Sequence, residues 1–332
     1  MYELLAICLV LAALLTINAL ASLAAAACWW FFEPALRNCS ARTRAEILFA
    51  LRISPPAMAL ISVGLLLVPS YVGYEPYSTS EVVSKKLAAL AFVSAAGGAF
   101  ALWRALRSWL ATHSLLRKWL ATADQIRLAR ISTPTFRIPH SFPIIAVVGT
   151  IRPRLFIAER VLQALSEEEL TAAIAHECGH LGARDNVKRS LLRACRDALM
   201  IVPCGRSLDR AWAEATESAA DEHAAQQGAA TALNLASALV KIAKMIPAGT
   251  RAAMPVAAFL VGEEVSGVKA RVRRLLEIAS TDYRRHVTNP VAKILPGMAL
   301  CSFLVLSVMV ANNPGVLVTV HSLIEGVVHL LS

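Results

Sequence analysis

The sequence predicts a mainly α-helical membrane protein, with four transmembrane helices and an α+β domain inserted between the third and the fourth. Hydrophobic residues make up 57% of the 332-residue chain, which is more than ordinary soluble domains contain. Four apolar runs are long enough to cross a bilayer as helices. The segment between the third and fourth runs is rich in charge and contains turn, strand and helix patterns. These three observations define the fold class.

The expected membrane spans follow the uncharged runs. The first run carries no charge, and it is too long, with no basic residues before it, to be a signal peptide. The second run has Pro55 and Pro56 near its start, and the third has Gly97 and Gly98 in its middle, where small residues let membrane helices approach. The expected organisation is three helices within 1–103 (about 4–32, 53–72 and 87–103), the inserted domain at 104–293, a fourth helix at 294–311 and a tail at 312–332.

The distribution of charge predicts the orientation in the membrane. Residues 104–293 contain 27 Lys and Arg against 17 Asp and Glu, and this excess equals the whole net charge of +10. The first loop is flanked by Arg37, Arg42, Arg44 and Arg52. Because cytoplasmic loops are rich in Lys and Arg, we expect a cytoplasmic inserted domain and two extracytoplasmic termini in the inner (plasma) membrane. The basic balance indicates anionic lipid rather than nucleic acid as a partner, since no RNA-binding aromatic clusters accompany it.

The inserted domain is expected to begin with a helix that continues the third span to about residue 130. Two short strands are expected at 144–148 and 154–158, joined by a turn at Gly149-Thr150. Helices are expected at 166–182, 186–202, about 207–227 and 229–245, followed by a basic amphipathic helix at 268–277. An exposed strand edge beside these helices can hold an extended peptide by β-addition.

Residues 176–180 read His-Glu-Cys-Gly-His, a pattern that indicates a zinc hydrolase. On a helix, His176 and His180 share one face, so both imidazoles can bind a single Zn²⁺. Glu177 then lies beside the metal, where a general base acting on water is needed. Ser166 and Glu169 form a capping box at the start of this helix, which makes the motif more specific than its five letters alone.

The sequence 37 residues after His180 supplies the remaining candidates. Glu217 would complete a ligand set of two histidines and one glutamate, which leaves a fourth position open for catalysis. Asp221 follows one helical turn later and is the candidate that receives the other N–H of His176 or His180. Two loop histidines, His140 and His286, are candidates for stabilising an oxyanion, and the sequence gives no geometry that selects between them.

These motifs together resemble the BlaR/MecR-type family of membrane metallopeptidases. The resemblance rests on the run 176–186, on Glu217 and Asp221, on the upstream Pro143, Gly149, Arg152-Pro153 and Phe156-Ile157, and on the later Arg273-Arg-Leu-Leu276. It covers about residues 1–312 and implies a gluzincin-like cytoplasmic zinc endopeptidase that is regulated through the membrane and cleaves a protein such as a transcriptional repressor. Arg184 and Asp185 belong to the same run. We expect them to form a pair that ends the helix, and the resemblance suggests support of the structure or the substrate site.

The chain differs from the antibiotic-sensing members of that family in its C-terminal segment, and two alternative functions remain open. Antibiotic-sensing members of that family carry an extracellular penicillin-binding domain after the last helix, whereas this chain has only residues 312–332 there, so we expect no β-lactam sensing by the chain itself. The HtpX-type and CAAX-protease families share both motifs, which would indicate quality control or processing. The alternative of another class is a non-catalytic signalling scaffold with a structural zinc. Glu177 argues against it, because a structural site has no use for a base.

The tail predicts an amphipathic helix with an apolar stripe and a polar stripe. The apolar stripe contains Leu317, Val320, Ile324, Val327 and Leu331, and the polar one contains His321, Glu325 and His329. We expect the helix to lie on the outer membrane surface; a contact with a membrane sensor partner or a second copy, or a second metal site, is the alternative. The seven cysteines show no paired spacing and are expected to be free thiols.

Overall fold

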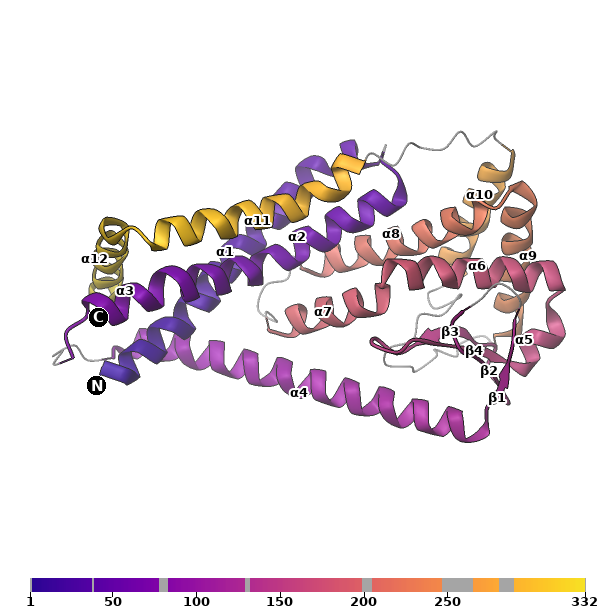
Figure 1. The fold of residues 1–332 in the computed structure, drawn as a ribbon, viewed down its shortest axis with the longest axis horizontal. Coiled ribbons are helices and arrows are strands. Elements are labelled where there is room, and N and C mark those ends of the chain that lie inside the picture. The colour runs from indigo at the N-terminus through magenta and orange to yellow at the C-terminus, as the bar shows by residue number, and fades with distance from the viewer. Residues whose placement is uncertain are drawn as a thin grey trace.

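The computed structural model describes residues 2–37, 39–77, 83–128, 132–198, 205–246, 265–280 and 290–331. Figure 1 shows an elongated molecule with long helices at one end and a small sheet with shorter helices at the other. The N-terminus and the C-terminus both lie at the end formed by the long helices.

Three helices among the described residues are long and apolar enough to cross a membrane. α1 (Tyr2–Leu36) contains the first expected span, and α4 (Lys85–Thr122) contains the third and continues beyond it without a break. The second span lies in a helix made of α2 (Ala41–Ser62), a π-helical turn (Val63–Leu67) and α3 (Val68–Tyr74). By the length and composition of these helices, the chain is a membrane protein.

The helix of the second span begins earlier than expected, so Pro55 and Pro56 lie inside it. Pro55 has no backbone N–H, which leaves the Leu51 carbonyl without its helical donor. The Ser54 hydroxyl donates to this carbonyl at 3.2 Å. Serine side chains that satisfy freed backbone groups make proline tolerable within membrane helices. The helix therefore begins before the prolines, and the expected bounds of the span, 53–72, stay a prediction.

The fourth span stays a prediction. Residues 294–311 lie in α11 (Pro290–Ala311), and α12 (Pro314–Leu331) follows after a sharp bend. The segments Cys301–Ala311 and Pro314–Leu330 together are long and apolar enough for one broken span, bent by 93°. The described residues are thus compatible with three spans or with four.

α12 packs across the ends of the long helices rather than extending away from them (Figure 1). Ile324 and Val328 are buried, and Val320 is partly buried beside them. Their neighbours come from α1, α3 and α4: Leu5, Cys8, Leu9, Tyr71, Leu87 and Ala91. Val327, which the sequence placed on the same stripe, is 50% exposed. The packed face is therefore centred on Ile324 and Val328, and contact of Val327 with the membrane surface stays a prediction.

The described residues form a sheet of four strands in the order β1-β2-β4-β3. The two expected strands are present as β3 (Ile145–Val148) and β4 (Arg154–Ala158), which pair antiparallel. Two further strands were missed: β1 (Asp124–Ile126) and β2 (Thr135–Ile138). β1 occupies a segment expected to be helical, since α4 ends at Thr122 rather than near residue 130. β2 pairs parallel with β4 and antiparallel with β1, so β3 forms one edge of the sheet.

Six helices complete this end of the molecule among the described residues. They are α5 (Glu159–Ala164), α6 (Glu167–Ala183), α7 (Asp185–Ala198), α8 (Gly205–Ala225), α9 (Ala229–Met245) and α10 (Val265–Ser280). A single core joins the sheet to α6 and α9, with Phe156 of β4, Ala173 of α6 and Leu239 of α9 fully buried. Burial of such apolar surface on both sides of α6 holds this helix in place against the sheet.

The hairpin of α1 and α2 also packs against the sheet-containing end. Trp29 of α1 and Leu48 of α2 are buried with Trp212 of α8 in a second core. Two ion pairs border it: Lys188 of α7 lies 2.6 Å from Glu46, and Arg52 lies 3.1 Å from Asp209 of α8. α8 is therefore held on one side by the long helices and on the other by α6. The expected boundary between 1–103 and 104–293 is crossed by these contacts and stays a prediction.

Candidate metal centre

Helix α6 begins with the capping box that the sequence predicts. The Ser166 hydroxyl accepts from the Glu169 N–H at 3.3 Å, and the Glu169 carboxylate accepts from the Ser166 N–H at 2.9 Å. Glu169 also accepts from Ser237 and Lys241 of α9, at 2.7 Å each. The start of α6 is thus held from two sides, which fixes the rotation of the helix and the direction in which its later side chains point.

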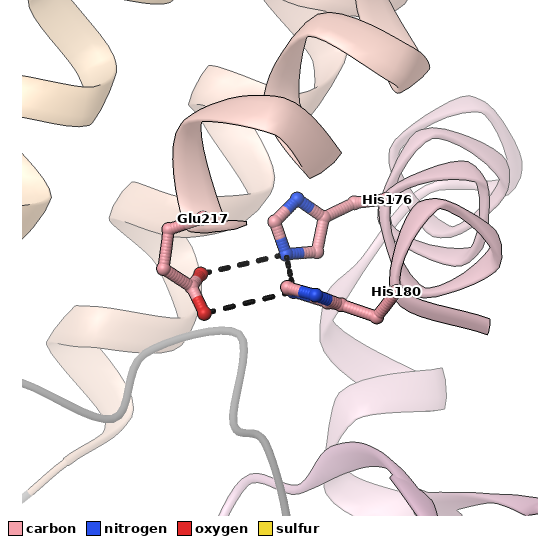
Figure 2. A group of neighbouring side chains, drawn as sticks. All are labelled: His176, His180 and Glu217. Carbon is pink, nitrogen blue, oxygen red and sulfur yellow. Dashed lines mark hydrogen bonds and ion pairs between the residues drawn. The ribbon is translucent and has the colours of Figure 1, made fainter. Parts of the chain in front are cut away.

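Three side chains converge between α6 and α8, as Figure 2 shows. His176 and His180 lie one turn apart on α6, and Glu217 faces them from α8. The two Nε2 atoms lie 3.2 Å apart, and each lies 3.6 Å from a carboxylate oxygen of Glu217. One ligand atom from each residue lies within 4.8 Å of the others. The structure thus brings the three predicted ligands together in a group that can hold one metal ion.

Gly179 allows α6 and α8 to approach this closely. A Cβ at this position would lie 3.0 Å from the Ala220 Cα and 3.3 Å from the Cβ atoms of Ala220 and His223. These contacts are tighter than most Cβ contacts, so a side chain at this position would push the two helices slightly apart, and the glycine permits their close approach. Glu217 and Asp221, one turn apart on α8, can then both reach the histidine rings.

Each histidine is held by a carboxylate at its Nδ1 atom. Asp221 Oδ1 lies 2.9 Å from His176 Nδ1, and Asp185 Oδ2 lies 2.7 Å from His180 Nδ1. Such contacts fix the ring orientation and direct the Nε2 atoms to the metal position. The role of Asp221 was predicted, but Asp185 was expected to pair with Arg184. In the structure Arg184 is instead exposed, and its left-handed backbone (φ 54°) ends α6.

An arginine from α10 completes the site, and it was not predicted from the sequence. Arg271 donates to both carboxylate oxygens of Asp221, through Nε at 2.9 Å and Nη2 at 2.7 Å. Its Nη1 lies 3.0 Å from Glu217 Oε2. A planar guanidinium suits this task because its donors lie in a fixed fork. The signal in the sequence was the basic run with Arg271, Arg273 and Arg274, whose spacing does not reveal which one faces the site.

Burial and neighbouring charges set the protonation of these groups. Burial lowers the pKa of His176, which favours the neutral imidazole that binds metals. Burial acts in the same direction on His180, but the hydrogen bond to Asp185 and the nearby carboxylates outweigh it and raise the pKa. Burial opposes the charge of Asp221, yet the Arg271 guanidinium and the bond to His176 hold the pKa of this carboxyl well below its usual range. Asp221 is thus a fixed anion at neutral pH.

Glu177 is a buried carboxylate beside the two histidines. It is 1% exposed, and neither oxygen has a hydrogen-bond partner within the described part of the chain. Burial raises its pKa to about 7, although the charge of His180 and the nearby Val147 N–H both favour the ionised form. An unpartnered buried polar group costs free energy and calls for an explanation. A base that must bind a proton near neutral pH supplies one.

The sheet edge beside α6 is closed. The sequence reading assumed an exposed edge, but residues 145–148 of β3 are at most 2% exposed. The side-chain amide of Asn186, at the start of α7, donates to the Val147 carbonyl at 2.9 Å and to the Gly149 carbonyl at 3.2 Å. Of the two edge strands, β3 is therefore covered, whereas Asp124 and Gln125 of β1 are exposed, and peptide binding at a sheet edge stays a prediction.

Among the residues that the structure describes, no other histidine and no cysteine joins the cluster. His140 accepts the Phe142 N–H at 3.0 Å within its own loop, and His286 lies outside the described residues. His321 lies near two carboxylates, of Glu75 and Glu325, at 3.9 and 3.5 Å. Across the ranges that the structure describes, the group of His176, His180 and Glu217 is the one found able to hold a metal. The six described cysteines are free, as expected, and Cys204 lies outside the described residues.

Residues 146–282 match the model of peptidase family M48. The matched segment runs from β3 to α10 and contains the histidines, Glu217 and Arg271. With the apolar helices and the site, this similarity supports a membrane-type zinc metallopeptidase and does not single out the BlaR/MecR type. No curated protein and no solved structure matched the chain.

Proposed function

We propose that this protein is a membrane-anchored zinc endopeptidase that cleaves protein substrates at the cytoplasmic side of the inner membrane. The observation that carries the proposal is the convergence of two histidines and Glu217 beside the buried, unpartnered carboxylate of Glu177. A structural metal site needs ligands but no additional base. Glu177 therefore favours an enzyme over a scaffold with a structural zinc.

The residues present fit Zn²⁺. Two imidazole nitrogens and one carboxylate form the ligand set of catalytic zinc sites, which leave a position open for water or substrate. The orienting carboxylates of Asp185 and Asp221 add negative charge around the cluster, which suits a divalent cation. When bound, Zn²⁺ would polarise the scissile carbonyl and make a nearby water more acidic.

The other residues of the site move the proton and position the ligands. Glu177 takes a proton from the attacking water and later passes it to the leaving amine, for which a pKa near neutrality is suited. Asp221 and Asp185 keep the two imidazoles in one tautomer and one orientation. Arg271 holds Glu217 and Asp221 in position through its contacts with both carboxylates.

The biological role is proposed from the resemblance of the motifs and from the charge pattern. Cleavage of a regulatory protein such as a transcriptional repressor, in response to a membrane sensor, is the first candidate. Quality control or processing of membrane proteins, as in HtpX-type or CAAX-type proteases, is the second. Comparing the protein termini of cells that carry the wild type or Glu177→Gln distinguishes them, because new termini would lie either in one regulator or in many membrane proteins.

The enzyme assignment is tested with purified protein. We expect about one zinc per chain in the wild type, and loss of this zinc in the His176→Ala, His180→Ala double variant. Glu177→Gln is expected to retain zinc and to lose cleavage of unfolded casein, since the amide keeps the shape of the side chain but not its basicity. Zinc in the double variant would contradict the ligand assignment. Undiminished cleavage by Glu177→Gln would remove this residue from the mechanism.

The tail is proposed as a regulatory contact of this enzyme. Its face around Ile324 and Val328 packs on the chain's own helices, so a sensor partner or a second copy would meet the other apolar side, where Leu323, Val327 and Leu330 are 65%, 50% and 79% exposed. Substituting these three by Ser is expected to change the regulation of cleavage in cells but not the zinc content. An unchanged response would leave α12 as a surface anchor on the outer leaflet.

A further inference from the structure

The register of the sheet defines which backbone groups of β3 face outward. The Ala158 N–H donates to the Ile144 carbonyl at 2.8 Å, and Ala146 is paired with Phe156. In an antiparallel pair, residues alternate between hydrogen bonding to the partner strand and pointing away from it. The carbonyls of Val147 and Gly149 therefore point away from β4, toward the free side of the sheet.

The side-chain amide of Asn186 donates a hydrogen bond to both of these outward carbonyls. One side-chain nitrogen donates to Val147 at 2.9 Å and to Gly149, directly after the strand, at 3.2 Å. An added strand would offer backbone N–H groups of its own to outward carbonyls at such alternate positions. The Asn186 amide thus occupies the acceptors that an extended peptide would use.

The same place on the strand adjoins the metal cluster. β3 packs against α6, the helix that carries Glu177 and both histidines. The residue before Asn186 is Asp185, which holds His180 at 2.7 Å. A peptide paired with Val147 would therefore pass directly beside the proposed base and the metal ligands, and Asn186 blocks that pairing from the first turn of α7.

We propose that Asn186 is a specificity-determining residue, which an extended peptide substrate must displace from the edge of β3 in order to bind. The inference rests on the proposed peptidase function. Peptide N–H groups would replace the Asn186 amide at the Val147 and Gly149 carbonyls, so the exchange leaves both acceptors satisfied. Because each new hydrogen bond replaces an existing one, backbone pairing alone adds little affinity, and side-chain contacts must select the substrate.

The test measures peptide binding in a chain that cannot cleave. In zinc-loaded Glu177→Gln protein, the dissociation constant of a fluorescently labelled extended casein peptide is compared with and without Asn186→Ala. Removing the competing donor is expected to tighten binding about tenfold, as the gain of one to two net hydrogen bonds implies. Asn186→Asp keeps the size but removes the amide donors, and it should tighten binding as well. Asn234→Asp on α9 is the matched control and should leave binding unchanged.

The outcomes separate the two proposals. Tighter binding in both Asn186 variants, with a lower KM for casein when Glu177 is restored, supports the role of Asn186. Unchanged or weaker binding in either variant overturns it and makes Asn186 a link between α7 and the sheet. Absence of casein cleavage by the wild type overturns the proposed function, and this inference with it. Cleavage by the wild type with unaltered binding in the variants overturns the inference alone.

Discussion

Arg271 holds Asp221 through two hydrogen bonds, of 2.9 Å from Nε and 2.7 Å from Nη2, across the interface between α10 and α8. Asp221 is fully buried, and Arg271 is 15% exposed at its side chain. The two residues therefore form a buried ion pair, and loss of one partner would leave the charge of the other uncompensated. It also ties the placement of α10 to the orientation of His176, which the same carboxylate contacts.

Removing this guanidinium is expected to destabilise the protein and loosen its metal. We predict that Arg271→Ala lowers the free energy of unfolding by about 3 kcal/mol, because the buried Asp221 and the partly buried Glu217 lose their partner. Zinc affinity should fall in parallel, since Glu217 and Asp221 are no longer fixed. Thermal unfolding and competitive zinc titration measure both quantities. Arg273→Ala, an exposed arginine two residues later on α10, is the control, and equal effects in the two variants would contradict the assignment.

Asp185 is expected to contribute to metal affinity through His180. Asp185→Ala should weaken zinc binding by about 10- to 100-fold, because the imidazole loses the carboxylate that fixes its tautomer. The neighbouring residue supplies the control: Arg184→Gly should keep the zinc affinity and stabilise α6 slightly, since glycine adopts the left-handed conformation without a steric penalty. If both variants bound zinc equally well, Asp185 would have no orienting role.

The buried Glu177 carboxylate predicts a pH dependence of the zinc-free protein. Its pKa is raised from 4.5 to about 7, so the folded state binds this proton more tightly than the unfolded chain. The resulting stability is complete below the unfolded pKa and is lost as the pH rises through the folded one, by roughly 3 kcal/mol in total. After chelation, the thermal midpoint should fall more between about pH 5 and about pH 8 in the wild type than in Glu177→Gln. If the thermal midpoints of the two proteins changed with pH by the same amount, Glu177 would not be a buried group with a raised pKa.

The orientation in the membrane is tested by labelling single cysteines in a chain without its native cysteines. Tyr77→Cys should react with an impermeant reagent from outside intact cells, because this residue is 81% exposed at the end expected outside. Ala229→Cys, on the exposed start of α9, should react only after the cells are opened. Labelling of position 229 in intact cells would place the peptidase domain on the outer side.

The sequence predicted those features that depend on local spacing. The capping box, the shared face of His176 and His180, and the one-turn spacing of Glu217 and Asp221 all follow from the geometry of a single helix. The same holds for the first three apolar helices, whose length and composition are properties of the segment itself.

The features that the sequence did not predict depend on contacts between distant elements. Asp185 could have paired with its neighbour Arg184, and only the packing of α6 and α7 brings it to His180. Arg271 lies 50 residues after Asp221, and its neighbours Arg273 and Arg274 have the same chemistry. The strands β1 and β2 are too short to show an alternating pattern; β2 forms because β4 is available as its partner, and β1 forms because β2 is.

The second core, around Trp29, Leu48 and Trp212, has a consequence for the order of assembly. During synthesis the hairpin of α1 and α2 leaves the ribosome before α8. The apolar surface around Trp29 and Leu48 can therefore form before the helix that carries Glu217 emerges. Packing of α8 on this hairpin then places Glu217, the last of the three candidate ligands to be synthesised. A water-soluble fragment cut at the expected boundary would leave Leu208 and Trp212 without their cover, and such a fragment should aggregate or bind detergent even if every ligand is present.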